Sequence, residues 1–332
     1  MSQVTHLTDG RKTFEVKKYT FSSESVPRLS CHDPECEERI ENGLPVVIPD
    51  TNLVSSASHW NIDYLQDNIG NGKFMTYISN NTKFKYYDDK KCPNVRSFKK
   101  PMEQVELTFS DFVQRINKGK SSKGERIYLQ QTLNETVGKN VVTDFLGFNW
   151  NWVTAQQKKH SFGPLTNNML LIGMEGNITP AHYDEQENFF SQIYGYKRFI
   201  LFPPEEFPNL YPHPTYHPCD RQSQVDFDDP DFEKFPKFKD AHAFETVVGP
   251  GDVLYLPMYW WHQVESIPNQ GHTISVTFWY KGRPTPEKVT YPLSAAQKVA
   301  MSRNIEKMIA QALNNPDEVP EFMQNMVLGR YT

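Results

Sequence analysis

Apolar and polar positions alternate with a period of two along much of the second half of the chain. From Met169 to Tyr280 this alternation recurs in short segments that are separated by turn residues. Because side chains two residues apart on a strand point to the same face, the pattern predicts a run of antiparallel strands. Such a run is typical of a double-stranded β-helix, the jelly-roll or cupin architecture, in a mainly β protein. The proline-rich segment 205–243 is expected to be a long insertion between two strands.

The first part of the chain has a different pattern. Residues 1–18 are polar, and we expect a flexible N-terminal tail. Residues 19–125 mix short apolar runs with helical spacing, which predicts an N-terminal α/β extension packed on the β core over 126–284. The expected elements of the extension are strands at 44–48, 75–78 and 84–87, a helix over 60–69, and a helix with Ser110 as its N-cap.

After Tyr280 the apolar spacing changes to the 3.6-residue period of a helix. Ser294 and Gln297 form a capping-box sequence at the start of one helix, and a second helix is expected to open near Pro320. Both helices carry apolar faces although they follow a β core that should already be closed. These faces either fold back on the core or pair with another subunit, so 285–332 is a candidate C-terminal helical dimerisation region.

Composition and charge narrow the classes of function. The 332-residue chain is 38% hydrophobic and 13% aromatic, with a net charge of −5. A weakly acidic chain offers no broad basic surface, so neither nucleic acid nor a membrane is an expected partner. The four cysteines match neither a zinc site nor a disulfide framework, and the N-terminus has no apolar leader. We expect a cytoplasmic protein, with the nucleus as a second location.

Residues His182, Tyr183 and Asp184 stand near the centre of the strand-rich region. On an extended strand the imidazole of His182 and the carboxylate of Asp184 share one face and can meet a single metal ion. His262, which follows an apolar strand and a second bend at Pro257, is the best candidate for the remaining ligand. Two histidines and one carboxylate form the facial triad that holds Fe(II) and leaves positions open. The alternative is a polar pair at a strand end plus a buried histidine.

Lys197 opens the strand that follows a turn at Gly195, and it shares a face with Phe199 and Leu201. A lysine on an apolar face directs its ammonium group toward the core, where that group needs a partner. An anion is the natural partner. An edge lysine that extends to solvent is the alternative when Lys197 is considered alone. Beside a metal triad, the carboxylate of a bound acid is the better interpretation.

Longer stretches of the chain carry a family resemblance. They are YLQQTLNETVG (128–138), DFLGFNWNW (144–152), TPAHYDEQ (179–186), HPCDRQSQVDF (217–227) and ETVVGPGDVLY (245–255). These stretches resemble the jumonji-C family of Fe(II)- and 2-oxoglutarate-dependent oxygenases, and within it the protein asparaginyl hydroxylases. The resemblance implies a jelly-roll core with flanking helices, Fe(II), the cosubstrates 2-oxoglutarate and O2, and a homodimer formed through the C-terminal helices. It implies hydroxylation at the β-carbon of asparagine in hypoxia-inducible factor-like segments and ankyrin repeats, as part of oxygen sensing.

The same resemblance implies roles for residues outside the triad. Binding of the 2-oxoglutarate 5-carboxylate would involve Lys197, Tyr128 and Thr179, with Asn188 near the other end of the cosubstrate. Contact with the target residue or its backbone would involve Tyr86, Gln186, Arg221 and Gln222, with Trp279 as a wall of the site.

One position departs from the family pattern. Thr277 stands where the family has an asparagine near the cosubstrate and the iron. A hydroxyl group cannot make the two separated hydrogen bonds of an amide, so cosubstrate affinity or oxygen handling is the property at issue. Thr277 is therefore counted among the candidate cofactor-binding residues.

Two other functions stay open at the level of sequence. One is a jumonji oxygenase that hydroxylates or demethylates a different side chain, such as a histidyl, aspartyl or methyl-lysyl group. The other is a metal-free, cupin-like binding module. Such a module would lack a ligand of the triad, and none is missing here.

Overall fold

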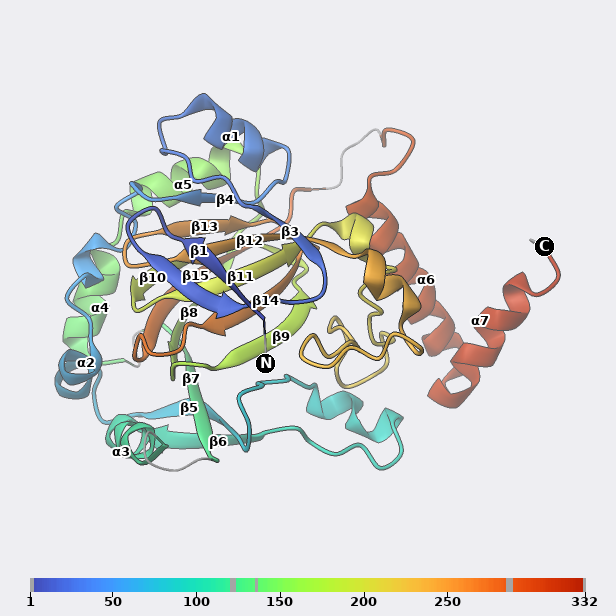
Figure 1. Ribbon diagram of the computed structural model, residues 1–332, viewed down its shortest axis with the longest axis horizontal. Coiled ribbons are helices and arrows are strands. Elements are labelled where there is room, and N and C mark those ends of the chain that lie inside the picture. The colour runs from blue at the N-terminus through green and yellow to red at the C-terminus, as the bar shows by residue number, and fades with distance from the viewer. Residues whose placement is uncertain (1–2, 120–123, 135–136, 285–288, 331–332) are drawn as a thin grey trace.

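Two facing β-sheets form the centre of the molecule (Figure 1). The computed structural model describes residues 3–119, 124–134, 137–284 and 289–330. Within these ranges, the larger sheet contains, in spatial order, β4 (Val46–Ile48), β13 (Val253–Leu256), β10 (Gln186–Tyr194), β15 (Thr273–Lys281), β8 (Leu165–Gly173), β7 (Arg126–Thr132), β5 (Lys73–Ser79) and β6 (Glu103–Thr108). The smaller sheet contains β3 (Ser22–Ser25), β12 (His242–Val248), β11 (Lys197–Phe202), β14 (Trp261–Ser266) and β9 (Ile178–Tyr183).

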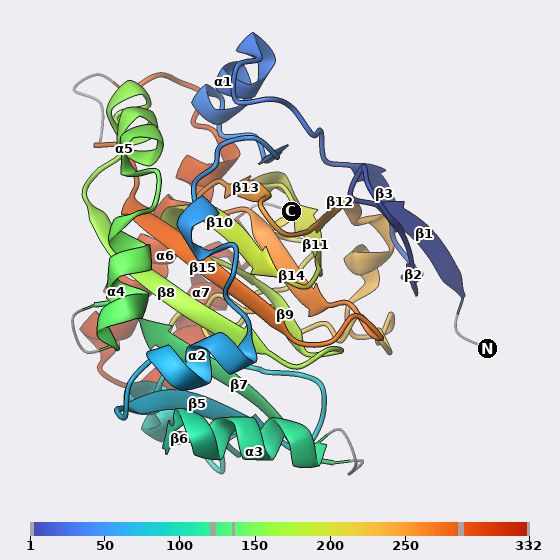
Figure 2. The ribbon, with the colours of Figure 1, turned by 90° about the vertical axis from the view of Figure 1, so that its left-hand side faces the viewer.

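The alternation of side chains sorts the apolar residues into layers. Phe190 of β10 and Phe199 of β11 meet between the two sheets. The preceding residue of β10, Phe189, points to the outer face of the larger sheet, as Phe278 does, and both rings contact tryptophans of α5 (Trp150–Lys159). Helices lie along this outer face (Figure 2). Because both faces are covered, the central strands are almost entirely buried. The helices that precede β8 in the chain are α1 (Pro34–Glu41), α2 (Ile62–Asn68), α3 (Phe109–Gly119), α4 (Lys139–Leu146) and α5 (Trp150–Lys159).

The predicted fold class, a mainly β jelly-roll core with flanking helices, is confirmed. The N-terminal extension is more closely joined to the core than a separate layer would be, because β4, β5 and β6 continue the larger sheet at its two ends. β5 and β6 pair with each other, and β5 also pairs with β7 of the core. The extension therefore widens the sheet that forms one wall of the site.

The expectation of a flexible tail over 1–18 is wrong for the residues that the structure describes. β1 (Val4–Thr8) and β2 (Thr13–Lys17) form an antiparallel hairpin. Phe14 and Val16 alternate onto one face of it and pack with Val247 and Ile267. The polar composition of the segment concealed this period-two pair, which is enough to dock a hairpin on a core.

Two local predictions in the extension also need correction. Residues 84–87 are not a strand; the contact there is a single bridge between Lys83 and Ile178. The helix expected to start at Ser110 begins at Phe109, and its first turn is capped by Thr108, whose hydroxyl accepts a hydrogen bond from the Asp111 amide (3.2 Å). Thr108 and Ser110 both have side chains suited to an N-cap, so the residue types alone did not separate them.

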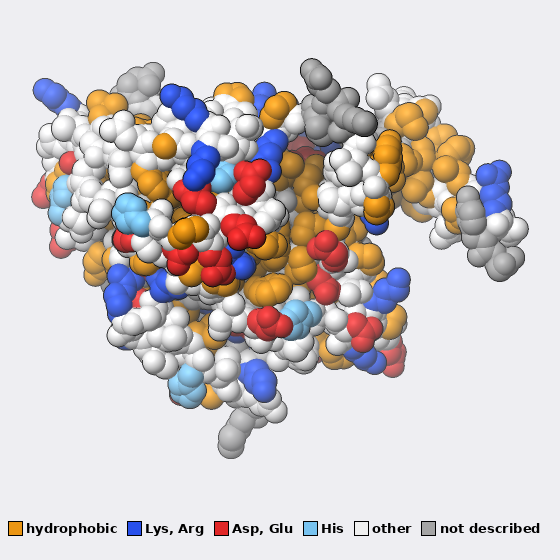
Figure 3. Space-filling view, turned by 90° about the horizontal axis from the view of Figure 1, so that it is seen from above, with side chains coloured by type: hydrophobic (Ala, Val, Ile, Leu, Met, Phe, Trp, Pro, Cys, Tyr) orange, Lys and Arg blue, Asp and Glu red, His pale blue; other side chains and the backbone are white. Residues whose placement is uncertain are grey.

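The C-terminal part is helical, as the spacing predicted. α6 (Ala295–Leu313) opens with the predicted capping box between Ser294 and Gln297. α7 (Val319–Val327) extends away from the body of the molecule, and hydrophobic side chains gather on this projecting arm (Figures 1 and 3). Phe322 and Val327 of α7 are 44% and 54% exposed. None of the described helices combines the length and apolar character needed to cross a membrane.

Candidate active site

The candidate triad lies on two neighbouring strands of the smaller sheet. His182 is on β9, Asp184 directly follows that strand, and His262 is on β14. His182 and His262 are paired across the two strands, and their ring centres are 4.1 Å apart. Nε2 of His262 lies 3.9 Å from Oδ2 of Asp184. The three side chains offer ligand atoms within 4.8 Å of one another, so the structure brings together the residues selected from the sequence.

Hydrogen bonds to the backbone orient both imidazole rings. Nδ1 of His182 lies 2.9 Å from the carbonyl oxygen of Pro180, and Nδ1 of His262 lies 3.0 Å from that of Trp260. A carbonyl oxygen only accepts, so each Nδ1 carries the proton and donates it. The lone pair of each neutral ring is then on Nε2, which is the arrangement that metal-binding histidines adopt.

The charges of the three groups suit a divalent cation. Burial, together with the neighbouring His262, lowers the pKa of His182 to about 3, and burial also lowers the pKa of His262. Burial alone would raise the pKa of Asp184, but His182, His262 and Arg221 outweigh it and hold the pKa of that carboxyl below its usual value. Two neutral nitrogen donors and one carboxylate match the Fe(II) facial triad. The residues present therefore fit an iron ion.

A cavity of about 210 Å³ runs from the triad into the space between the two sheets. It is smaller than the pockets of roughly 300–1,000 Å³ that enclose drug-sized ligands, and its size suits a small acid. Most of the residues implied by the family resemblance line this cavity. They are Tyr86, Tyr128, Thr179, Asn188, Lys197, Arg221, Gln222, Thr277 and Trp279.

Lys197 marks the inner end of this cavity. Its side chain is 1% exposed, so the alternative of an edge lysine that reaches solvent is wrong. Nζ lies 3.1 Å from the hydroxyl oxygen of Tyr128 and about 5 Å from the ring centre of Phe190. Among the described residues no carboxylate pairs with Lys197, and burial lowers its pKa to about 7. An ammonium group in this position is matched to an anionic ligand.

Two further lining residues bear on cosubstrate binding. Oδ1 of Asn188 is buried and has no hydrogen-bond partner among the described residues. A buried orphan acceptor in a cavity is a contact that a ligand or water can supply. Thr277 is 1% exposed, and its hydroxyl oxygen accepts a hydrogen bond from the Met169 amide (3.3 Å). The hydroxyl that replaces the family's amide is thus partly engaged by the neighbouring strand β8.

The residues expected to bind substrate lie near the mouth of the cavity. The amide of Gln222 donates to the backbone carbonyl of Tyr86, so these two residues are held together. Gln186 does not line the cavity; it lies in an adjoining surface hollow, which it shares with Arg221 and Trp279. That hollow opens toward solvent and leads to the triad residue Asp184.

Sequence reasoning missed Gln130. This residue lines the cavity, and its amide donates to the hydroxyl oxygen of Tyr86. The signal was available, because Gln130 stands two positions after Tyr128 on β7 and must point to the same face.

A second group of metal-ligand residue types lies outside the cavity, at His213, His217 and Cys219. The two rings are nearly parallel, 13° apart, so their in-plane lone pairs do not converge on one point. The amide of Cys219 donates to Nδ1 of His217 (2.9 Å), and Nζ of Lys85 lies 3.2 Å from Nε2 of His213. These contacts occupy a nitrogen of each ring, and we interpret the group as part of the insertion's own packing.

Comparison with known proteins places this fold and site in a family. The model of the cupin-like domain matches residues 33–286, and the chain belongs to that family. It is 27% identical to tRNA wybutosine-synthesizing protein 5 of Gallus gallus over 303 residues, 86% of each chain. It is 29% identical to lysine-specific demethylase JMJ30 of Arabidopsis thaliana over 250 residues, 72% of this chain and 50% of the relative. It is 43% identical to JmjC domain-containing protein D of Dictyostelium discoideum over 96 residues, 29% of this chain and 21% of the relative.

The matched relatives thus include JmjC-domain proteins, and the chain spans half or less of the length of JMJ30 and protein D. JmjC-type cupins are Fe(II)- and 2-oxoglutarate-dependent oxygenases, and the His182, Asp184 and His262 cluster is compatible with that class.

Proposed function

We propose that this protein is an Fe(II)- and 2-oxoglutarate-dependent oxygenase that hydroxylates asparaginyl side chains of protein substrates. The observation that carries the proposal is the placement of two complementary groups in one cavity: a metal-type triad near the mouth and Lys197 at the inner end. A short dicarboxylic acid can place one end at the metal and the other at an ammonium group. When bound, the iron and 2-oxoglutarate supply the oxidation that inserts one oxygen atom of O2 into a C–H bond.

The chain's own residues bind and position. His182, Asp184 and His262 would hold the iron, and Lys197 with Tyr128 would receive the distal carboxylate. The aromatic and aliphatic walls around them, including Phe190 and Phe199, limit the access of water to the site. The open hollow beside Asp184 gives a peptide side chain a route to the metal.

The assignment of asparagine as the target rests on the resemblance to asparaginyl hydroxylases, such as factor inhibiting HIF. Arg221, Gln222 and Gln186 lie around the mouth and the adjoining hollow, and they supply both donors and acceptors. An asparagine amide offers two donor hydrogens and one acceptor oxygen, which such a set can satisfy. The proposed substrates are hypoxia-inducible factor-like transactivation segments and ankyrin-repeat proteins.

A second candidate is an oxygenase that acts on another protein side chain. It is favoured by the names of relatives, which include lysine-specific demethylases from Arabidopsis thaliana and Danio rerio. Methyl-lysine requires a site that accepts a cationic, apolar group rather than an amide. The Arg221 guanidinium near the mouth, 3.2 Å from Oδ1 of Asp184, is a like charge and argues against that substrate.

Turnover of 2-oxoglutarate with defined peptides tests the proposal. We expect Fe(II)-dependent turnover that increases with a peptide carrying the hypoxia-factor C-terminal asparagine, and one added oxygen atom on that asparagine by mass spectrometry. Demethylation of a methyl-lysine peptide without asparagine oxidation would favour the second candidate. No turnover with any peptide in iron-replete buffer would favour a binding module. Asp184→Ala should abolish turnover; near-native activity would remove Asp184 from the ligand set.

We also propose that α6 and α7 form a homodimer contact. α7 projects from the body and exposes apolar side chains, and Met301 and Met308 of α6 are 47% and 63% exposed as well. A nine-residue terminal helix is marginal alone in water, and covering this face with a second copy would stabilise it. The family resemblance supports the same arrangement.

A further inference from the structure

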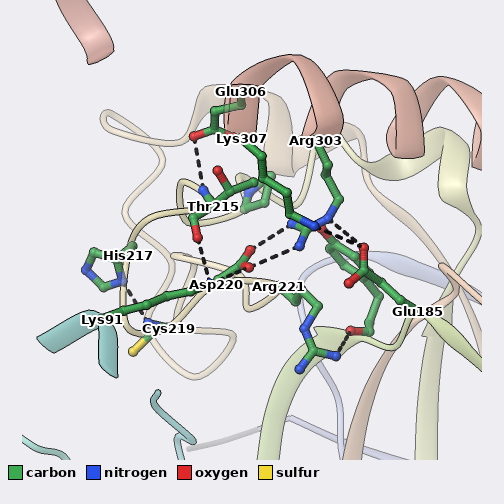
Figure 4. A network of polar contacts seen from close by, with 12 residues as sticks. Lys91, Glu185, Thr215, His217, Cys219, Asp220, Arg221, Arg303, Glu306 and Lys307 are labelled. Carbon is green, nitrogen blue, oxygen red and sulfur yellow. Dashed lines mark hydrogen bonds and ion pairs between the residues drawn. The ribbon is translucent and has the colours of Figure 1, made fainter. Parts of the chain in front are cut away.

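Arg303 of α6 is a charged residue in an unusual position. It stands in the middle of a helix near the C-terminus, yet it is only 4% exposed. Its guanidinium group points from α6 into the region between the insertion and the end of β9 (Figure 4). A buried guanidinium requires several acceptors at once, so its partners show what it holds in place.

The partners of Arg303 lie on both sides of a metal-ligand candidate. Nη1 donates to the hydroxyl oxygen of Tyr183 (2.8 Å), and Nε donates to the carboxylate of Glu185 (3.1 Å). Tyr183 and Glu185 are the residues immediately before and after Asp184. One side chain of α6 therefore holds the side chains of both chain neighbours of Asp184.

Arg303 also binds the insertion segment that contains Asp220 and Arg221, and this segment contacts Asp184. Nη1 and Nη2 bind the two carboxylate oxygens of Asp220 at 2.7 and 3.0 Å, a bidentate pair that is 9% exposed or less on each side. The next residue, Arg221, has a left-handed backbone (φ 67°), and its carbonyl oxygen accepts a hydrogen bond from the Tyr183 amide (3.1 Å). Its guanidinium lies 3.2 Å from Oδ1 of Asp184.

The two carboxylate oxygens of Asp184 therefore have different neighbours. Oδ1 faces Arg221, whereas Oδ2 faces His262 and the metal position. If the Asp220–Arg221 segment shifted, Oδ1 would lose its partner and the carboxylate could rotate. The orientation of a ligating carboxylate is normally fixed in this way by groups outside the coordination sphere.

We propose that Arg303 is a positioning residue that fixes the metal ligand Asp184, and that it couples the C-terminal helix α6 to the metal site. The inference rests on the proposed function, because it needs a metal at the triad. Arg303 does not line the cavity that holds the triad; it borders the adjoining hollow. It acts through Tyr183, Glu185 and Asp220.

Attachment of α6 does not depend on Arg303 alone. Val299 and Ile309 of the same helix are buried, and the Glu306 carboxylate accepts a hydrogen bond from the Thr215 amide (3.0 Å). Lys91 supplies a second cation for Asp220 (2.9 Å). A substitution at Arg303 should therefore leave the helix docked while it loosens the segment around Asp184.

The test measures metal binding of the full chain rather than turnover alone. Metal-free protein is titrated with Mn(II) and with Co(II), and the Co(II) absorption spectrum reports the coordination geometry. We expect Arg303→Gln to weaken Mn(II) binding by about 10- to 100-fold and to change the Co(II) spectrum. Lys307→Gln is the matched control, because it removes the same charge one turn further on, from a side chain that is 48% exposed and lies 3.8 Å from Glu185. The control should bind metal as the wild type does.

Arg303→Lys gives a second comparison if Arg303→Gln does not fold. Lysine keeps the charge but has one nitrogen, so it cannot contact Tyr183, Glu185 and Asp220 together. We expect a folded protein with weakened Mn(II) binding. A folded Arg303 variant whose Mn(II) affinity and Co(II) spectrum match the wild type would overturn the inference. Absence of metal binding by the wild type would overturn the proposed function instead.

Discussion

Replacing Lys197 with methionine should change stability and cosubstrate binding in opposite directions. In the ligand-free protein the Lys197 ammonium group is buried, with the Tyr128 hydroxyl as its hydrogen-bond partner and the ring of Phe190 nearby. Methionine has a similar length, no charge and a flexible chain that can fill the same space. The substitution therefore removes an uncompensated charge without leaving a large hole.

The size of the effect follows from the pKa. Burial lowers the pKa of Lys197 from 10.5 to about 7. A change of this size corresponds to a cost of charging on the order of 4–5 kcal/mol. The lost hydrogen bond to Tyr128 and the lost ring contacts offset part of it, and replacing buried charges by apolar groups typically stabilises by up to about 1–4 kcal/mol. We expect a gain within that range for the ligand-free protein.

Cosubstrate binding should fall at the same time. Loss of the charged partner of a buried carboxylate costs about 2–5 kcal/mol, which is roughly a 30-fold to several-thousand-fold loss of 2-oxoglutarate affinity. Thermal unfolding with and without 2-oxoglutarate measures both the stability of the ligand-free protein and its affinity for 2-oxoglutarate. A ligand that binds only the folded state raises the stability of that state. Lys85→Met is the matched control: Lys85 is a half-buried lysine that contacts His213 and does not line the cavity. A Lys197→Met protein that is less stable than the wild type and binds 2-oxoglutarate unchanged would refute the reasoning.

Three further predictions follow from the site and the C-terminal arm. Because the bound carboxylate needs protonated Lys197, whose pKa is about 7 in the free protein, 2-oxoglutarate affinity measured calorimetrically should fall by up to about tenfold per pH unit above pH 7; a flat profile to pH 9 would contradict this. Gln222→Ala should impair peptide hydroxylation more than peptide-free 2-oxoglutarate turnover, and equal losses would assign Gln222 to the fold or the cosubstrate. Val327→Glu should shift the protein from dimer to monomer in sedimentation; a wild type that is monomeric at micromolar concentration would end the dimer proposal.

Much of the fold followed from side-chain periodicity. The strands that carry His182, Lys197 and His262 were predicted, and so were the faces to which these residues point, because a period of two leaves little choice. The long insertion and the capping box of α6 were also visible, since proline-rich runs and cap residues act locally. Features fixed by local geometry were therefore accessible from the sequence.

Features fixed by distant contacts were not accessible in the same way. The N-terminal hairpin is held by Phe14 and Val16 against residues more than 200 positions away, and nothing in 1–18 encodes that surface. The role of Arg303 could not be predicted from the helical spacing, because its acceptors come from two other segments. Gln186, the first residue of β10, lies in the adjoining hollow and not in the cavity that Asn188 lines two positions later.

The two consecutive cations of β11 give the strongest argument that Lys197 serves a ligand. Arg198 points to the opposite face of the strand and is fully buried, as Lys197 is. The fold supplies Arg198 with two carboxylates, Glu245 at 2.6 Å and Glu265 at 3.2 Å, and these raise its pKa although burial opposes them. On the other face of the same strand, Lys197 receives a tyrosine hydroxyl and no carboxylate from the described residues. A buried ammonium group without a carboxylate partner lowers the stability of the folded protein. Because the fold neutralises Arg198 but not Lys197, we infer that the partner of Lys197 is an acid that binds in the cavity.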